Sequence, residues 1–223
     1  MAAVRVGAGV HDWREPIGQR WVRQTGRMSR RIVILSGAPG TGKSTIAPAL
    51  AVELGLPLFA KDTIKETLHD AMCEPGPVDR AWSKRLGAGA MELLWRLAAD
   101  APACLLEANF APSTSPRPRL MLSELAVDGS LIEVHCSCHR EEAVRRYEAR
   151  ALTSARHPVH VEARYPDEWR ELETVVGLGP VVEVDTTRPV DVRAIGEAVR
   201  SFWSTAQGIR ARSLPSRPAD ADL

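Results

Sequence analysis

The segment from Gly37 to Thr45 carries the clearest chemical signal in the sequence. It reads GAPGTGKST and matches the pattern G-x-x-x-x-G-K-[ST] in full. Its glycines permit positive φ angles and let backbone N–H groups approach a phosphate closely, and a helix predicted from Lys43 adds its positive end. The pattern predicts a nucleotide-binding loop, with Lys43 on the β- and γ-phosphates and Ser44 on Mg²⁺. The residues expected to contact ATP here are Gly37, Ala38, Pro39, Gly40, Thr41, Gly42, Lys43, Ser44 and Thr45.

Two carboxylates and an amide follow predicted strands. Asp62 comes after an apolar run at 56–60, Glu107 ends the run ACLLE, and Asn109 stands two residues later. Glu107 is a candidate for Mg²⁺, directly or through water, or for a substrate hydroxyl, and Asn109 for a substrate contact. The plainer alternatives are a solvated strand end and loop, and for Asp62 a cap on the helix that Thr63-x-x-Glu66 predicts.

Three arginines form the next group. Arg146 and Arg150 lie four residues apart on one predicted helix and so share a face, and Arg156 follows in the next loop. Planar guanidinium groups suit the charge that develops on a transferred phosphoryl group, and one such arginine contributes about 10³–10⁵ in rate. The alternative is a solvated basic face in an arginine-rich chain. We expect at least one of the three to be catalytic.

Lysine is scarce in this chain and occurs at Lys43, Lys61, Lys65 and Lys84 alone. Lys61 and Lys65 flank Asp62 and either favour an anionic acceptor or form a solvated face, and we favour the solvated face. His157 and His160 stand three residues apart without an acidic or thiol partner in a supporting pattern. We therefore expect them to contact the lid or the substrate rather than a metal.

Short apolar runs alternate with helical patterns between residues 31 and 205. This alternation predicts a parallel sheet with helices on both faces and a ligand at the carboxyl ends of the strands. Strands are predicted at 31–36, 56–60, 103–107, 131–136 and 181–185, and helices over 43–54, from Asp62 onward, 79–100, 115–126, 141–151 and 190–205.

These segments, in this order, resemble a known family. They are GAPGTGKST, FAKDTIKE around Asp62, LEANF around Glu107, Arg146-x-x-x-Arg150, RHPVH from Arg156, and the closing EVDTT. Over residues 31–205 the chain resembles the P-loop kinase group that includes chloramphenicol phosphotransferase, zeta toxins and gluconate kinase-like proteins. The resemblance implies an α/β three-layer sandwich with a five-stranded parallel sheet, the P-loop NTPase fold of nucleoside and shikimate kinases, and a helical lid carrying arginines.

The resemblance also implies an activity. The group transfers the γ-phosphate of ATP, with Mg²⁺, to a hydroxyl of a small molecule such as an antibiotic, sugar, nucleoside or nucleotide sugar. Asp62 would face that hydroxyl as base or positioner, with Lys43 and the arginines completing the catalytic set and His157 near the substrate. Thr186 and Thr187 would lie along the adenine. A kinase domain at 29–206, with a lid at about 146–166, would stand between a flexible arm at 1–28 and a flexible tail at 207–223.

Composition narrows the possible partners. A net charge of +1 with 44% hydrophobic and 26% charged residues is that of an ordinary globule and argues against nucleic acid or a membrane surface. No apolar run approaches ~18 residues. Cysteines 73, 104, 136 and 138 lack metal or disulfide spacing, so we expect reduced thiols in a cytoplasmic protein that is a monomer or homodimer. A nucleic-acid-end kinase and an ATP-binding regulatory or toxin-type module without turnover stay open as alternatives.

Overall fold

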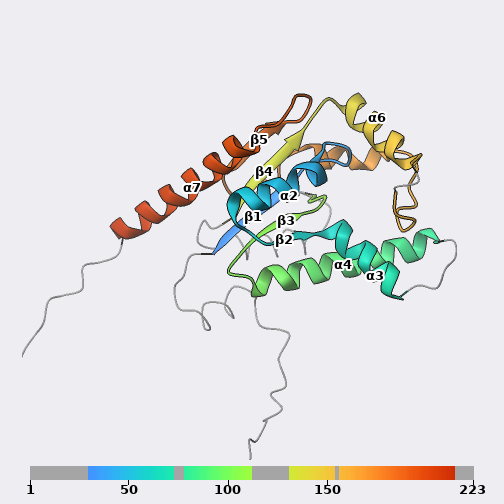
Figure 1. Cartoon of the computed structure of the whole chain (residues 1–223), viewed down its shortest axis with the longest axis horizontal. Helices are drawn as coiled ribbons and strands as arrows, with labels where there is room; N and C mark the ends of the chain where they lie inside the picture. Colours follow the sequence, from blue (N-terminus) through green and yellow to red (C-terminus); the bar gives the residue numbers. More distant parts are fainter. Residues whose placement is uncertain (1–29, 73–77, 112–130, 154–155, 214–223) are drawn as a thin grey trace, which may run out of the picture.

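Five parallel strands form one sheet in the order β2-β3-β1-β4-β5 (Figure 1). The strands are β1 (Arg31–Ser36), β2 (Leu58–Ala60), β3 (Ala103–Glu107), β4 (Leu131–Ser137) and β5 (Val181–Asp185). The computed structural model of the chain describes residues 30–72, 78–111, 131–153 and 156–213. The chain runs from β1 to β2 at one edge of the sheet and from β4 to β5 at the other edge. The connections that follow the neighbouring strands β1 and β4 therefore run in opposite directions, and ligands bind at such a point in open parallel sheets.

Helices cover both faces of the sheet. They are α2 (Lys43–Leu54), α3 (Lys61–Met72), α4 (Arg80–Asp100), α6 (Arg140–Ala151) and α7 (Val192–Ser213), with a 3₁₀ helix, η1 (Asp167–Glu173). Side chains of α2 and α7 pack on one face, and those of α3 and α4 pack on the other. Within the described ranges no helix combines the length and the apolar character needed to cross a bilayer.

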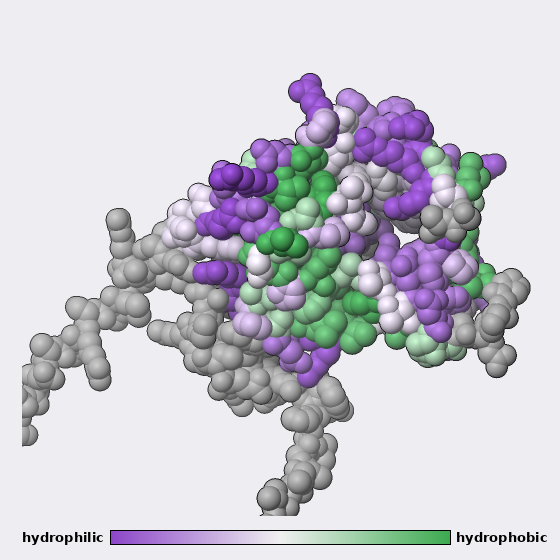
Figure 2. All heavy atoms as spheres, in the orientation of Figure 1, coloured by the Kyte–Doolittle hydropathy of each residue, from purple (hydrophilic) through white to green (hydrophobic). Residues whose placement is uncertain are grey.

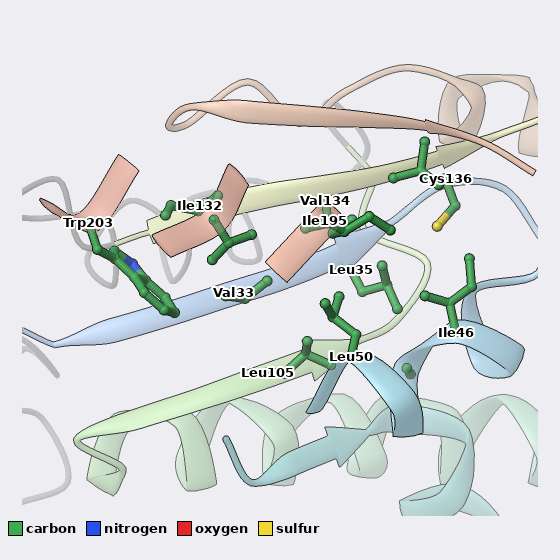
Figure 3. Close-up of a cluster of buried hydrophobic side chains, with 13 residues drawn as sticks. Val33, Leu35, Ile46, Leu50, Leu105, Ile132, Val134, Cys136, Ile195 and Trp203 are labelled. Carbon is green, nitrogen blue, oxygen red and sulfur yellow. The ribbon is translucent and has the colours of Figure 1, made fainter. Parts of the chain in front are cut away.

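The central strand β1 contributes side chains to both halves of the hydrophobic core. Its side chains alternate, so Ile32 and Ile34 join the cluster beneath α4. Val33 and Leu35 join the cluster beneath α2 and α7, which Figure 3 shows. All four are fully buried, which explains why the strand reads as an unbroken apolar run. Burying such a side chain contributes about 1.5–3 kcal/mol. The strand that carries the phosphate loop is therefore firmly anchored in the hydrophobic core.

The predicted fold class is confirmed, and β1, β3, β5 and α2 have the predicted bounds. Gly55, with φ 64°, forms the left-handed cap of α2, as its position suggested. The sequence did not indicate η1. The helix predicted at 115–126, the arm at 1–28 and Cys73 lie outside the described residues. Of the described cysteines, Cys104, Cys136 and Cys138 carry free thiols.

Two predicted boundaries are wrong. Helix α3 begins at Lys61, directly after β2, so Thr63 lies inside the helix and does not cap it. The Thr63-x-x-Glu66 spacing is a local pattern, and here the strand runs straight into the helix without a loop residue. Helix α7 continues to Ser213, well past the predicted end near residue 205.

One carboxylate is buried on β4 and organises the loop before β5. Glu133 accepts hydrogen bonds from the Ser36 hydroxyl and from the backbone N–H groups of Val176 (2.9 Å) and Gly177 (3.0 Å). Burial raises the pKa of Glu133, but the hydrogen bonds from His135, Ser36 and the two N–H groups lower it by more, so the pKa lies below its ordinary value.

We expect Glu133→Gln to lower the free energy of unfolding by about 2 kcal/mol. The NH₂ group of the glutamine would face one of the N–H or O–H groups that now donate to the carboxylate, and that buried donor would lose its acceptor. A group with a depressed folded-state pKa stabilises the fold above its unfolded pKa and loses that effect as pH falls through the folded value. The difference between the two proteins should thus be full at pH 7 and shrink below pH 4.5. Urea unfolding at several pH values measures it. Glu183→Gln, exposed on β5, is the control and should change stability by less than about 0.5 kcal/mol.

Candidate functional site

The phosphate loop connects β1 to α2 and depends on three glycines. Gly37, Gly40 and Gly42 have φ angles of 124°, 84° and 83°. A Cβ on Gly37 would lie 2.1 Å from the carbonyl oxygen of Cys136, and one on Gly40 would lie 2.2 Å from that of Ala143. These two positions admit no side chain, and all three need a left-handed backbone. The positive φ angles expected from the sequence are present.

Lys43 is buried beneath the loop. Only 5% of it is exposed, and its ammonium donates to the carbonyl oxygens of Gly37 (2.7 Å) and Ala38 (2.9 Å). Burial lowers the pKa of Lys43, while the neighbouring Glu107 opposes that shift. In the part of the chain that the structure describes, Lys43 forms no ion pair with a carboxylate. Its ammonium therefore contacts carbonyl oxygens directly, and the charges of Glu107 and Asp62 favour it from a distance.

A hydroxyl and a carboxylate meet beside the loop. Ser44, in the first turn of α2, donates to Oε1 of Glu107 at the end of β3, at 3.3 Å. Glu107 is 4% exposed, and burial raises its pKa although Lys43 acts in the opposite direction. Oxygen atoms of this kind are ligands that Mg²⁺ accepts alongside phosphate and water. No group of three or more His, Cys, Asp or Glu side chains able to hold a metal occurs within the described ranges, so these two residues fit magnesium carried by a nucleotide.

Asp62 lies in the first turn of α3 and faces the same region. Its Oδ1 is 3.3 Å from the ammonium of Lys61. Burial raises the pKa of Asp62, but Lys61 and His160 lower it by more, and the net pKa is below the ordinary value. The side chain is therefore a carboxylate at neutral pH, able to accept a hydrogen bond.

These groups surround a cavity of about 560 Å³ between the phosphate loop, α3, α4 and the segment after α6. Figure 2 shows the surface hollowed between the regions that Figure 1 labels α6 and α3. The sequence-predicted residues that line it are Pro39, Gly40, Gly42, Lys43, Ser44, Thr45, Asp62, Glu107, Asn109, Arg150, Arg156 and His157.

The other predicted residues lie elsewhere. Gly37, Ala38 and Thr41 form the buried base of the loop, where the Thr41 hydroxyl donates to the Ala38 carbonyl at 2.8 Å. Thr186 sits next to Gly42, outside the cavity lining, and donates to the carbonyl of Ser137 at 3.0 Å. Thr187 binds the carboxylate of Asp185 through its hydroxyl at 2.6 Å.

The three predicted arginines separate into two environments. Arg150 and Arg156 line the cavity, where Arg156 donates to the hydroxyl of Tyr147 at 2.9 Å. Arg146 instead binds Glu142, one turn earlier on α6, at 2.6 Å, and the carbonyl of Thr186 at 3.2 Å. The shared helix face therefore does not bring Arg146 to the cavity.

The loop at 156–162 is held against α3 and α4 by side-chain contacts. His157 pairs with Asp70 at 2.9 Å, and His160 pairs with Glu66 at 2.8 Å. The Ser83 hydroxyl of α4 donates to the carbonyl of Val159 at 2.7 Å. These acidic partners precede the histidines by 87 and 94 positions, which is why the local sequence pattern did not reveal them.

Several lining residues had no recognisable sequence signal. They are Ser83 and Gly87 of α4, Tyr147 of α6 and Glu162 in the loop that follows it. The scarcity of lysine is the exception, because all four lysines of the chain line the cavity. The solvated-face interpretation is wrong for Lys65, which is only 6% exposed. Its burial comes from α4 and the 156–162 loop, which the sequence does not place.

Comparisons with known proteins agree with this geometry. Residues 33–75 match the model of the ATPase family associated with various cellular activities (AAA), a stretch that holds most of β1, the phosphate loop, α2, β2 and α3. An uncharacterized protein of Mycobacterium tuberculosis is 25% identical over 186 residues, which make up 79% of this chain and 35% of that protein. A counterpart from Mycobacterium bovis has the same values. The chain thus spans about a third of the length of these curated relatives.

Solved structures extend the comparison. A gluconokinase from Sinorhizobium meliloti is 20% identical with a TM-score of 0.48, covering 84% of this chain and all of that one, which is too distant to indicate function. A presumed kinase from Chloroflexus aurantiacus is 31% identical with a TM-score of 0.67, over 78% of this chain and 99% of that one. Since this similarity extends over nearly the whole of that protein, the chain belongs to the same family, and its phosphate loop, parallel sheet and motifs identify that family as the P-loop kinase group.

Proposed function

We propose that this protein transfers the γ-phosphate of ATP to a hydroxyl group of a small molecule. One observation carries the proposal: the phosphate loop, the carboxylates of Asp62 and Glu107, and the guanidinium groups of Arg150 and Arg156 line the same cavity. Phosphoryl transfer needs these parts together, since it proceeds by positioning and electrostatic stabilisation. The likeness to the presumed kinase of Chloroflexus aurantiacus supports it.

The phosphate loop would bind the triphosphate. Helix α2 begins at Lys43, beside the cavity, so backbone N–H groups of its first turn would bind phosphate oxygens. The ammonium of Lys43 would exchange its carbonyl partners for phosphate oxygens. Ser44 and Glu107 would hold Mg²⁺. When bound, that ion neutralises part of the charge on the β- and γ-phosphates.

Asp62 would orient the acceptor. Its lowered pKa keeps it ionised, so it accepts a hydrogen bond from the acceptor hydroxyl and aligns that oxygen with the γ-phosphorus. Phosphoryl transfer has a loose transition state, so alignment contributes more than strong basicity. Asn109 and His157, which share the cavity, would contact the rest of the acceptor.

Arg150 would bind the phosphoryl group in transit. Its side chain lines the same cavity as Lys43 and the phosphate loop, and its charge is among those that lower the pKa of Lys43, which supports this role. Arg156 is held by Tyr147 and by the carbonyl of Glu162 at 2.6 Å and would close the same side. The segment at about 146–166 would thus act as the lid of a kinase domain at 29–206, with Arg146 and the threonines Thr186 and Thr187 on the adenine side.

ADP release in the presence of ATP, Mg²⁺ and a panel of hydroxyl compounds tests the proposal. Antibiotics, sugars, nucleosides, nucleotide sugars and oligonucleotide ends form the panel. Release that depends on a small acceptor supports a small-molecule kinase. Release with oligonucleotides alone, or ATP binding with no acceptor-dependent release, would contradict it in favour of a nucleic-acid-end kinase or a regulatory module.

Lys43→Ala should weaken magnesium-dependent ATP binding by about 100-fold, because a charge-assisted contact to phosphate is lost from a buried site. Calorimetric titration measures the affinity. Arg193→Ala is the matched control, since it removes a positive charge whose side chain is 81% exposed on α7, and its affinity should equal that of the wild type. Equal affinity in the Lys43 variant would contradict the proposed nucleotide site.

Asp62→Asn should lower kcat by about 10²–10³, because an amide neither carries the charge nor accepts the hydroxyl proton in the same geometry. The Kd of ATP should stay within about twofold, since Asp62 contacts the acceptor and not the phosphates. Steady-state kinetics and calorimetry give the two values. Asp100→Asn, at the far end of α4, is the control for the substitution. Normal turnover by the Asp62 variant would remove Asp62 from the mechanism.

Arg150→Ala should reduce kcat by about 10³, the lower end of the contribution of such an arginine. Arg146→Ala on the same helix should reduce it by less than about tenfold, because Arg146 binds Glu142 and Thr186 outside the cavity. The comparison is made at saturating ATP. An equal loss of kcat in both variants would contradict the assignment of this role to Arg150 alone, because both arginines of α6 would then contribute to the transfer.

A further inference from the structure

The cavity extends beyond the phosphate loop to a group of lysines. Lys61 and Lys65 come from α3 and Lys84 from α4, and all three line the cavity. The chain has 29 lysine and arginine residues, yet every lysine it contains faces this one space. A second cationic region therefore lies beside Asp62, in addition to Lys43.

Lys65 is the centre of this region. It is 6% exposed, and its ammonium donates to the hydroxyl of Ser83 at 2.8 Å. The Ser83 hydroxyl donates its own hydrogen bond to the carbonyl of Val159 at 2.7 Å, so it offers Lys65 a lone pair and no charge. An ammonium has three donors, and within the described ranges this one has no carboxylate at ion-pair distance. A buried charge of this kind is unfavourable without an ionic partner.

The acids around the cavity already have other partners. Glu66 binds His160 at 2.8 Å, and Glu162 binds Arg80 at 3.3 Å. Asp62 contacts Lys61 at 3.3 Å. Burial lowers the pKa of Lys65, and the positive charge of Lys61 lowers it further, while Asp62 and Glu162 oppose the shift from a distance. Lys65 thus lies near another positive charge, and the acids around it are paired with other side chains.

The backbone of α4 leaves space under these lysines. Gly87 lines the cavity, and a Cβ built on it would lie 3.9 Å from Nζ of Lys61 and 3.9 Å from Cε of Lys65. Glycine inside a helix costs about 1 kcal/mol relative to alanine. Both lysine side chains therefore converge over a position that carries no side chain of its own.

We propose that the acceptor of this kinase carries an anionic group, a phosphate or a carboxylate, that binds Lys65 together with Lys61 and Lys84. The inference rests on the proposed function and narrows its substrate class from any alcohol to an anionic alcohol. Lys61 adjoins Asp62 in the sequence, and Lys65 follows one helical turn later. The anionic group therefore sits beside the hydroxyl that Asp62 orients.

Matched acceptors test the proposal in the full chain. A sugar, its sugar acid and its monophosphate form one series, and a nucleoside and its monophosphate form another. The kcat/KM of an anionic member should exceed that of its neutral parent by about 100-fold. The two anionic arms distinguish a phosphate from a carboxylate. If neutral acceptors were used as well as anionic ones, the proposal would fail while the kinase function would stand.

Substitutions show which residues cause the preference for an anionic acceptor. Lys65→Met keeps the length of the side chain and should lower kcat/KM for the anionic acceptor by about 100-fold, with less than about a threefold change for the neutral parent and for the Kd of ATP. Gly87→Asp would place a carboxylate against the lysines and should act in the same direction, whereas Gly89→Asp, exposed on the same helix and outside the cavity lining, should behave as the wild type. A Lys65 variant that weakened ATP binding instead would assign the lysine to the nucleotide.

A binding measurement keeps the two proposals separable if no acceptor releases ADP. With the phosphate loop saturated by a non-hydrolysable ATP analogue, inorganic phosphate is titrated into the protein by calorimetry. Binding to the wild type and to Gly89→Asp, with loss in Lys65→Met and Gly87→Asp, would support the anion site even where the kinase function had failed. Equal binding to all four proteins, or to none, would overturn it.

Discussion

Two contacts between a glycine and a carbonyl group set the geometry of the site. Gly37 lies against the end of β4, and Gly40 lies against α6, each so closely that a Cβ would come within 2.1–2.2 Å of a carbonyl oxygen. The phosphate loop is thereby fixed to the centre of the sheet and to α6 at once. This fixes the N-terminus of α2, brings Ser44 to Glu107, and leaves Lys43 extended beneath the loop.

Charged side chains of the site lie close together where folding has removed most of their contact with water. Burial lowers the pKa of Lys43 and raises that of Glu107, and each opposes the shift of the other. Electrostatic interactions are stronger in such surroundings than in water. A phosphate that enters this cavity would meet groups whose hydration has already been removed by folding, so little reorganisation accompanies binding.

The opposite wall of the cavity depends on contacts between distant segments. The 156–162 loop is tied to α3 by two histidine–carboxylate pairs and to α4 by Ser83. The hydroxyl of Ser83 also receives the hydrogen bond of Lys65. Ser83 thus contacts both the loop, which would close the cavity over an acceptor, and Lys65, which would bind that acceptor. The position of the loop and the position of Lys65 therefore depend on the same side chain.

The sequence alone determined the elements whose information is local. The phosphate loop is a contiguous pattern, β1 and β3 are buried apolar runs, and Gly55 marks the end of α2, so each was predicted at its observed position. The acids at strand ends were found because all strands of a parallel sheet end at one edge. Tertiary structure decided the rest. The burial of Lys65, the histidine partners and the separation of Arg146 from Arg150 arise from contacts between segments that neither spacing nor composition relates, because packing, and not periodicity, decides which side chain loses its water.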